Sequence, residues 1–361
     1  MALDRITLSH FRNHVASRLE GSAKINLLFG ENGAGKTNVL EALSLLAPGR
    51  GLRRAGLPEM AGNSGTGGFA VSALLDCHDG TEAVQLGTGT SPERPGRRLV
   101  QINGAEASAV SLGEWLAVGW LTPAMDRLFA DSAGARRRYM DRLALALDPA
   151  HARYASRYDA ALRERNRLLA SEVDPDPQWL ASLETQLADS GAALTQGRAR
   201  MIERLSEALA ALPEAPFARP ALTYLAGGPL EAGDLAAELA RQRARDRAAQ
   251  RTLTGPHRDE LEVTMAGNGM PAASCSTGEQ KAMLIAMTLA HAELAAAGRP
   301  GVLLLDEVAA HLDPVRREAL FERLRTGNAQ AWLTGTELAP FDAIEGEAAV
   351  WRVAGGAVAR V

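Results

Sequence analysis

A segment near the N-terminus has the residue types and spacing of a phosphate-binding loop. Residues 30–37 read Gly-Glu-Asn-Gly-Ala-Gly-Lys-Thr and match G-x-x-x-x-G-K-[ST], between an apolar run and a helical pattern. Glycines in such a loop let backbone N–H groups face phosphate oxygens, and the following helix N-terminus adds positive potential. Lys36 would place a charge on the β- and γ-phosphates, and the Thr37 hydroxyl would be a ligand of Mg²⁺. The residues expected around the nucleotide are Gly30, Glu31, Asn32, Gly33, Ala34, Gly35, Lys36, Thr37 and Asn38.

A second segment supplies two acids that fit the same chemistry. Residues 302–305 form an apolar run typical of a central parallel strand, and Asp306 and Glu307 follow it directly. Because ligands bind at the carboxyl ends of parallel strands, we expect these acids beside the phosphate loop. Asp306 would complete the Mg²⁺ site, and Glu307 would orient the water that attacks the γ-phosphate. The expected catalytic residues are therefore Lys36, Asp306 and Glu307.

A third segment, residues 276–281, reads Ser-Thr-Gly-Glu-Gln-Lys and begins a helical run. It resembles the signature motif of ATP-binding-cassette ATPases, in which a serine and a glycine at a helix N-terminus bind the γ-phosphate held by a second subunit. Ser276 and Gly278 would have that role. Ser276 is also a good helix N-cap, with Glu279 completing a capping box, and both roles are compatible. Cys275 departs from the cassette pattern, which usually has leucine there.

The chain after Glu307 matches the positions at which two cassettes communicate. Residues 309–313 occupy the place of the loop through which each cassette senses the other. A transporter cassette has a switch histidine after the next strand, where this chain has the sequence Thr-Gly-Thr at residues 334–336. His311 lies too close to Glu307 to be that histidine, so we interpret it as a loop residue.

The composition limits the class of protein that carries these motifs. With 361 residues, 46% of them hydrophobic and 23% charged, the chain has a globular balance and room for two or three domains. Its two cysteines, Cys77 and Cys275, suit a reducing compartment. No apolar run reaches the 18 residues of a membrane span, and no signal-peptide pattern begins the chain, so we expect a cytoplasmic protein with no membrane partner. The net charge of −4 indicates no particular partner.

The elements that must position the motifs form two regions. We expect two strands within the first 30 residues, at 3–11 and 25–29, a helix over 36–46, and an antiparallel sheet over 60–110 with turns at Asp79-Gly80 and Asn103-Gly104. Strands are expected again at 302–305 and 331–334, with a closing hairpin over 350–361. The fold class is α/β: a P-loop ABC-type ATPase head with a mixed sheet and an antiparallel β-subdomain, plus an inserted all-α lobe. Residues 1–123 with 252–361 would form the discontinuous head, and residues 124–251 the lobe.

Inside the lobe, helix-forming residues dominate. The sequence Asp-Pro-Asp-Pro at residues 174–177 predicts the turn of a helical hairpin. Apolar residues recur every seven positions at Leu180, Leu187, Leu194 and Met201. The complementary stripe is interrupted at residues 190, 197 and 204, which predicts short packed helices rather than a long coiled coil.

Taken together, these segments resemble the RecF family nearly from end to end. The matching segments are residues 11–13 (Phe-Arg-Asn), 30–41, 121–123, 136–141, 163–169, 254–259 (Thr-Gly-Pro-His-Arg-Asp), 276–281 and 305–313. The Gly-Pro-His-Arg part is the most distinctive of them.

The resemblance implies a cassette ATPase of the branch that includes the SMC and Rad50 heads, without their long coiled coil. ATP would be held between two heads and drive homodimerisation, with weak DNA-stimulated hydrolysis. The dimer would bind duplex DNA and junctions with single strands and, with RecR and RecO, promote loading of RecA. Lys36, Thr37, Asp306 and Glu307 would act in cis, Ser276 and Gly278 in trans, Asp313 at the dimer seam, and Arg12 and Asn13 as nucleotide contacts. No glutamine can be assigned to the Mg²⁺-sensing role.

DNA binding without sequence preference requires arginines that neutralise phosphates. The candidates are Arg136, Arg137, Arg138, Arg163, Arg165, Arg167, Arg241, Arg243, Arg245, Arg247 and Arg251. On one helix Arg241 would align with Arg245, and Arg243 with Arg247. The alternative is that these arginines are solvated and paired with acids. Aromatic residues are only 4% of the chain, which disfavours a stacking platform for single strands.

Other functions use some of the same motifs. An ABC-type ATPase subunit acting on a protein or transport partner would share all three nucleotide segments. However, about 245 residues separate the phosphate loop from Ser276, and the switch histidine is missing. A clamp with long arms needs more than a helical insert of about 125 residues at 1.5 Å per residue. A P-loop kinase would leave residues 276–281 without a role.

Overall fold

The computed structural model describes residues 3–62, 67–76, 83–213 and 215–361, which divide into two compact units. The first unit comprises Met1–Asp126, Pro213–Phe217 and Leu284–Val361, and the second comprises Arg127–Leu212 and Ala218–Met283. Cys77 and the turn expected at Asp79-Gly80 lie outside the described residues. Among the described residues, no helix is both long and apolar enough to span a membrane.

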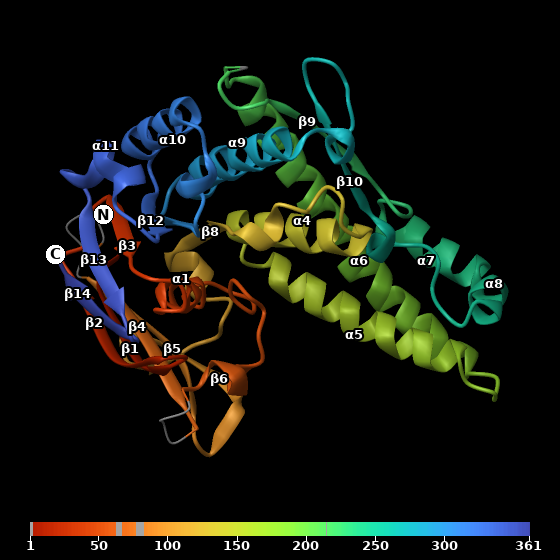
Figure 1. Cartoon of the computed structure of the whole chain (residues 1–361). Coiled ribbons are helices and arrows are strands. Elements are labelled where there is room, and N and C mark those ends of the chain that lie inside the picture. The colour runs from red at the N-terminus through yellow and green to blue at the C-terminus, as the bar shows by residue number, and fades with distance from the viewer. Residues whose placement is uncertain (1–2, 63–66, 77–82, 214) are drawn as a thin grey trace. The chain divides into compact units, whose positions relative to one another are not determined.

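A mixed six-stranded sheet of the first unit carries the phosphate loop (Figure 1). Its order is β14-β13-β3-β12-β11-β8, and every pair is parallel except β13 with β14. The strands are β3 (Ile25–Phe29), β8 (Ala117–Leu121), β11 (Gly301–Leu305), β12 (Gln330–Gly335), β13 (Ala349–Ala354) and β14 (Ala357–Arg360). All residues of β11 are buried, as expected for the continuous apolar run at 302–305, and the closing hairpin is confirmed.

The second sheet of this unit is antiparallel throughout, in the order β2-β1-β4-β5-β6-β7. Its strands are β1 (Leu3–Phe11), β2 (His14–Glu20), β4 (Phe69–Leu75), β5 (Val84–Ser91), β6 (Arg94–Ile102) and β7 (Ala105–Glu106). The expected Asn103-Gly104 turn is confirmed, and both residues have positive φ, at 50° and 79°. The sequence predicted two strands in the first 30 residues, and the structure has a third, β2, which pairs with β1. Its buried side chains, His14, Ser17 and Leu19, are two or three positions apart, so the strand lacks a regular alternation.

The phosphate-loop helix α1 (Lys36–Ser44) shares the hydrophobic core with residues of both sheets. It is shorter than the expected 36–46, because the N–H groups of Leu45 and Leu46 bond carbonyls three residues back. The other helices of this unit are α2 (Leu57–Met60), α3 (Leu112–Trp115), α10 (Pro314–Thr326) and α11 (Asp342–Glu345), with 3-10 turns η1 (Pro123–Met125), η4 (Ala309–His311) and η5 (Ala339–Phe341).

A half-buried arginine binds the backbone of the segment that follows α1. The Arg98 guanidinium, from β6, donates to the carbonyl oxygen of Leu45, to that of Ala47 at 3.1 Å and to that of Gly49 at 2.7 Å. Burial lowers the pKa of Arg98 to about 10. The group bonds backbone carbonyls of the segment that follows α1, so it ties the antiparallel sheet to that segment.

The second unit is mainly helical. Its elements are α4 (Ala133–Leu147), α5 (His151–Leu169), α6 (Pro177–Ala210), α7 (Ala232–Arg241), α8 (Arg243–Ala248), β9 (Pro220–Leu225), β10 (Glu260–Met265), η2 (Pro256–Arg258) and η3 (Ala272–Ser274). Helix α9 (Thr277–Ala295) begins in this unit, and its residues from 284 onward belong to the first. The expected hairpin turn at residues 174–177 is confirmed, because Asp176 caps α6 by accepting from the Gln178 N–H at 2.7 Å.

Helix α6 differs from the short helices that the sequence predicted. It runs unbroken for 34 residues, and the residues at seven-position spacing are all buried. The interruptions at 190 and 197 are packing sites rather than breaks. Ser190 donates to the Gln186 carbonyl at 2.5 Å, and a Cβ on Gly197 would lie 2.8 Å from His151 Nδ1. Small residues thus admit neighbouring side chains without ending the helix.

Two further features differ from the expected all-α lobe over residues 124–251. The lobe contains a two-stranded sheet, because β9 pairs with β10 in antiparallel register from Glu260↔Leu225 to Met265↔Pro220. That pairing draws residues 252–283 into the second unit, whereas the sequence placed them with the head. Strand pairing over a separation of about 40 residues has no local sequence signal that would locate this boundary.

Candidate nucleotide site

The phosphate loop leaves β3 and enters α1 in a conformation that two of its glycines make possible. Gly30 has φ +152°, and a Cβ there would lie 2.1 Å from the Val353 carbonyl oxygen. Gly35, the residue before α1, has φ +117°, and a Cβ there would lie 2.7 Å from His14 Nε2. Any side chain at either position would collide with a neighbouring strand, so the loop can approach β13 and the β1–β2 turn only with glycine.

The Lys36 ammonium is folded back over this loop. Its Nζ donates to the Gly30 carbonyl at 2.5 Å and to the Glu31 carbonyl at 2.9 Å. Burial lowers the pKa of Lys36, and the nearby carboxylates of Glu307 and Asp306 act in the opposite direction. The charge is therefore held at the loop by neutral carbonyls, which suits a cation whose final partner is an anionic phosphate.

Asp306 follows β11 and lies against the first turn of α1. Its Oδ1 accepts from the Thr37 hydroxyl at 2.9 Å and from the Thr334 hydroxyl at 2.9 Å. The side chain is buried, and burial raises the pKa of Asp306 while the two hydroxyl donors lower it. Its other oxygen, Oδ2, receives no hydrogen bond from the described residues. Thr37 and Asp306 therefore leave oxygen lone pairs available to a hard cation such as Mg²⁺.

Glu307 has an uncommon backbone conformation, with φ +55° in the left-handed region. Its N–H donates to the Thr334 hydroxyl oxygen at 2.8 Å, which fixes the backbone beside Asp306. The sheet thus brings together the four residues that the sequence placed in cis: Lys36, Thr37, Asp306 and Glu307.

Arg12 and Asn13, expected as nucleotide contacts, are both tied to the loop and its helix. The Arg12 guanidinium makes a two-pronged ion pair with buried Glu41 of α1, at 2.8 and 3.0 Å, and Glu41 raises the pKa of Arg12. Asn13 Nδ2 donates to the Ala34 carbonyl at 3.0 Å, and Asn13 Oδ1 accepts from Asn38 at 2.7 Å. In the structure both residues brace the loop.

Sequence reasoning assigned no site role to Glu41, Arg53 or Thr334. Arg53 Nη1 donates to Asn38 Oδ1 at 2.6 Å and to Glu41 Oε2 at 2.8 Å, so Glu41 is held by two arginines. The available signal was an acid inside the apolar run at 39–43, because an acid on a buried helix face needs a cationic partner. Thr334 gives no such signal, since its role depends on the order of strands in the sheet.

The capping interpretation of Ser276 is confirmed. The Ser276 hydroxyl accepts from the Glu279 N–H at 3.3 Å, and the Ser276 N–H donates to the Glu279 carboxylate at 2.8 Å. Ser276 and Gly278 are exposed at the N-terminus of α9, and their contact with a second subunit stays a prediction. Asp313 similarly caps α10 by accepting from the Arg316 N–H at 3.0 Å, and its side chain is exposed.

The Mg²⁺-sensing role stays unassigned. Strand β8 is the neighbour of β11, and the Asp306 N–H donates to the Leu121 carbonyl at 2.9 Å. The residues that follow β8, at 122–126, read Thr-Pro-Ala-Met-Asp and contain no glutamine.

Several arginines expected to contact DNA form ion pairs or hydrogen bonds within the second unit. Arg165 is fully buried and pairs with Glu184 and Asp246 at 3.1 and 2.7 Å, so it is not a DNA contact. The remaining paired arginines are Arg136 with Glu260, Arg137 with the Asp259 carbonyl, Arg167 with Glu164, Arg241 with Glu238, Arg243 with Glu184 and Arg247 with Asp174. The alternative of arginines paired with acids holds for these, except for Arg137, which donates to a backbone carbonyl.

The expected alignment of Arg241 with Arg245 is wrong, because α7 ends at Arg241 and α8 begins at Arg243. Arg251 likewise lies beyond the end of α8 at Ala248. The exposed arginines left among the candidates are Arg138, Arg163, Arg245 and Arg251.

The segment at 254–259 forms a buried polar centre of the second unit. Asp259 Oδ2 accepts from Arg198 at 2.7 Å and from the Tyr224 hydroxyl, and its Oδ1 accepts from the Gly227 N–H at 2.8 Å. His257 Nδ1 and the Tyr158 hydroxyl are 2.7 Å apart. These groups are held by one another, which makes the segment a structural element.

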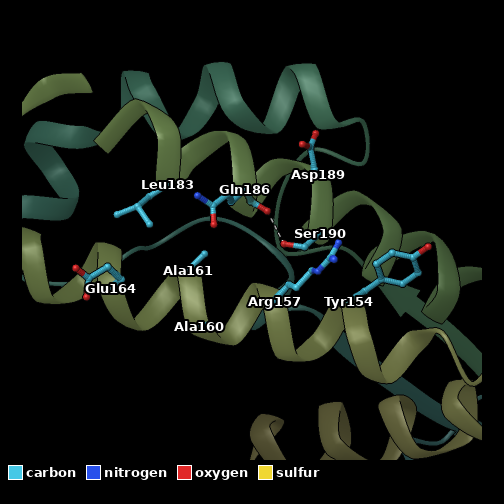
Figure 2. Close-up of a pocket in the computed structure, with 9 residues that line it drawn as sticks. All are labelled: Tyr154, Arg157, Ala160, Ala161, Glu164, Leu183, Gln186, Asp189 and Ser190. Carbon is cyan, nitrogen blue, oxygen red and sulfur yellow. Dashed lines mark hydrogen bonds between the residues drawn. The ribbon is translucent and has the colours of Figure 1, made fainter. Parts of the chain in front are cut away.

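Helices α5 and α6 also border a groove of about 520 Å³, shown in Figure 2. The lining residues are Tyr154, Arg157, Ala160, Ala161, Glu164, Leu183, Gln186, Asp189 and Ser190. None of the expected nucleotide residues is among them. The described residues also contain no group of three or more His, Cys, Asp or Glu side chains arranged to hold a metal ion by themselves.

Comparison with known proteins places this geometry in a family. A family model described as the RecF/RecN/SMC N terminal domain matches residues 2–340. The DNA replication and repair protein RecF of Mesorhizobium japonicum is 46% identical over 372 residues, covering 99% of this chain and 97% of that protein. The protein of the same name from Brucella suis is 45% identical over 370 residues, covering 99% and 95%.

Solved structures show the same fold. A structure described as the recombination mediator protein RecF-ATPrS in the RecFOR pathway matches with a TM-score of 0.87 at 23% identity, over 99% of this chain and 98% of that chain. The Smc head domain of Pyrococcus furiosus with an extended coiled coil, bound to the C-terminal domain of ScpA, matches with a TM-score of 0.54 at 16% identity, over 100% and 96%. The α/β head fold with a helical lobe that the sequence predicted is confirmed, with the correction that the lobe also contains the β9–β10 sheet.

Proposed function

Because the chain belongs to the RecF branch of the RecF/RecN/SMC family, we propose that it is an ATP-dependent DNA-binding protein of recombinational repair and replication-gap recovery. The observation that carries the proposal is the meeting of two phosphate-loop residues, Lys36 and Thr37, with the acid pair that follows β11. A loop that binds phosphates and a carboxylate that can orient water are the two requirements for hydrolysing a nucleoside triphosphate.

ATP would bind with its β- and γ-phosphates in the loop. Lys36 would exchange its two carbonyl partners for phosphate oxygens, which compensate its charge better. Thr37 fits as a ligand of Mg²⁺, because its hydroxyl proton is given to Asp306 and its lone pairs stay available. Asp306 fits as the carboxylate of that site. Mg²⁺, when bound, neutralises charge on the β- and γ-oxygens.

Hydrolysis would use Glu307. Its carboxylate would accept a hydrogen bond from a water molecule placed in line with the bond to the leaving ADP. The water oxygen forms the new bond to the γ-phosphorus, the bond to the β-phosphate oxygen breaks, and the water proton passes to the carboxylate and then to phosphate. The left-handed backbone at Glu307 sets the direction from which that carboxylate acts.

Dimerisation would couple nucleotide to DNA. Ser276 and Gly278 would bind the γ-phosphate held by a second copy, since both are exposed at the N-terminus of α9. Asp313 would lie at the seam between the copies. Of the candidate DNA contacts, we propose the exposed arginines, Arg138, Arg163, Arg245 and Arg251, because the others are committed to acids or carbonyls. RecR, RecO and RecA would be partners in the same cytoplasmic pathway.

The test is DNA binding measured at one stated salt concentration with gapped duplex, blunt duplex and single strand. Each DNA is combined with ATP, with ADP and with the Lys36→Ala variant. We expect ATP-dependent binding that is strongest where duplex meets single strand and is lost in the variant. Binding that ignores the nucleotide, or no binding, would contradict the proposal and favour an ABC-type ATPase acting on a protein or transport partner.

A further inference from the structure

Thr334 stands close to where a transporter cassette has its switch histidine, and its side chain joins the two catalytic acids. Strand β12 lies between the phosphate-loop strand β3 and β11, with Leu333 opposite Leu305 and Thr334 opposite Leu28. Thr334 therefore follows the last residue of β12 that pairs with β11, and it lies beside the acids that follow β11. It is 1% exposed, so its hydroxyl must find its partners inside the protein.

The direction of its hydrogen bonds follows from the available protons. Asp306 as a carboxylate only accepts, so the Thr334 hydroxyl gives its single proton to Asp306 Oδ1 at 2.9 Å. The Thr334 oxygen then accepts the Glu307 N–H at 2.8 Å. One hydroxyl thus fixes the orientation of the carboxylate that would serve Mg²⁺ and the backbone of the residue that would orient water.

The backbone at Glu307 needs such support. A non-glycine residue at φ +55° is in a sparsely populated region, and it persists only when neighbouring structure imposes it. Without the Thr334 hydroxyl, the half-buried N–H of Glu307 would lose its partner and the left-handed conformation would lose a restraint. A shift of about 1 Å in a catalytic group can cost about 100-fold in rate.

We propose that Thr334 is a positioning residue for ATP hydrolysis, which holds the Glu307 carboxylate in its catalytic direction. The proposal rests on the proposed ATPase function. It assigns to a hydroxyl of the central strand a task separate from nucleotide binding, because Lys36, which would bind phosphate, hydrogen-bonds the Gly30 and Glu31 carbonyls and not Thr334.

The test compares Thr334→Val, which keeps the shape and removes the hydroxyl, with Thr334→Ser, which keeps the hydroxyl. Thr288→Val is the matched control, since Thr288 is a buried threonine of the same unit whose hydroxyl donates only to Leu284 of its own helix, at 2.7 Å. We expect Thr334→Val to lower kcat by about 10- to 100-fold with the KM for ATP within about 3-fold. Thr334→Ser should keep kcat within about 3-fold of the value for the native protein.

A double variant identifies the residue through which Thr334 acts. In a Glu307→Gln background, adding Thr334→Val should lower kcat by less than about 2-fold, because the group being positioned is already gone. An equal loss in both backgrounds, a rise in KM that matches the fall in kcat, or failure of Thr334→Ser to restore the rate would overturn the proposal.

Hydrogen exchange supplies a readout that needs no ATPase activity. In the nucleotide-free protein, Thr334→Val should speed exchange of the Glu307 amide by at least about 10-fold while the amides of β11 are unchanged. Unchanged exchange at Glu307 would overturn the proposal. If the native protein hydrolyses no ATP, the proposed function fails, and the exchange result still decides whether Thr334 holds Glu307.

Discussion

Asp306 in the first unit and Asp259 in the second are both buried, and their oxygens are used in opposite ways. Asp259 accepts hydrogen bonds at both oxygens, from the Arg198 guanidinium, the Tyr224 hydroxyl and the Gly227 N–H. Asp306 accepts two hydroxyl hydrogen bonds at Oδ1, and no described residue donates to Oδ2. One carboxylate is saturated by the protein, and the other has capacity left for a ligand.

The two aspartates also differ in whether a cation is bonded to them. Asp141 and Asp259 raise the pKa of Arg198, so that pair is mutually stabilised. No guanidinium or ammonium bonds Asp306 within the described structure, and burial raises the pKa of Asp306. A buried acid that no cation hydrogen-bonds is typical of a site that is completed by a ligand, and a saturated ion pair is typical of a site that stabilises the fold.

The largest effect on ligand binding at the first of these two sites is expected from a change at Lys36. We expect Lys36→Ala to weaken ATP binding by at least about 100-fold, because the loop loses the Lys36 ammonium, and to abolish ATP-driven dimerisation. The free energy of unfolding should change by less than about 1 kcal/mol, since among the described residues Lys36 hydrogen-bonds two neutral backbone carbonyls. Titration with a fluorescent ATP analogue, light scattering and urea unfolding check these outcomes. A variant that still dimerises with ATP would remove the loop from the mechanism.

The next effect in size separates the two aspartates directly. Asp259→Asn leaves Arg198 without one of its two carboxylates, so we expect a loss of about 3 kcal/mol in the free energy of unfolding. Asp306→Asn is the matched control and should cost no stability, because burial already disfavours its charge. Urea unfolding followed by circular dichroism measures both. Equal losses in the two variants would show that the two sites do not differ as argued.

A third change concerns turnover alone. Glu307→Gln should lower kcat for ATP hydrolysis by about 100-fold and lengthen the lifetime of the ATP-bound dimer, because the water loses its orienting carboxylate. ATP affinity should stay within about 3-fold. Single-turnover hydrolysis and light scattering test this. Normal hydrolysis by the variant would show that another group orients the water.

The smallest expected effect is a pH dependence of the second unit. Burial lowers the pKa of His257, so the folded protein keeps it neutral while the unfolded chain takes up a proton below pH about 6.5. Stability should therefore fall as the pH drops from 7.5 to 5.5, by up to about 1 kcal/mol from this residue. Urea midpoints of the native protein and of His257→Gln, measured at both pH values, isolate the contribution. A variant with the same pH dependence as the native protein would contradict it.

The residues of the nucleotide site could be predicted because their spacing repeats a local geometry. The loop at 30–37 needs glycines at fixed positions, and an apolar strand followed by two acids places those acids at the ligand edge of a parallel sheet. Thr334 and Arg53 could not be found this way, since their partners come from other segments and depend on strand order and loop path.

The lobe was harder to predict for a related reason. Arg165 has the spacing of a solvated helix face, yet Glu184 and Asp246, which are 19 and 81 residues away, bury it. The small residues at 190 and 197 of α6 interrupt the apolar stripe in the sequence, and only the structure shows that neighbouring groups pack or bond there within a continuous helix. The segment at 254–259, distinctive in sequence, has a stabilising role that only its contacts reveal.

The length of α6 has a consequence for how such a molecule could grow. Its apolar residues recur every seven positions beside α5, and the turn that joins the two helices, at residues 170–176, is almost fully exposed. Whole heptads inserted on both sides of that turn would lengthen the pair by about 10 Å each and keep the seam in register. Neither hydrophobic core would change, so arms of graded length could be grafted at this tip, or acquired there by duplication of short segments.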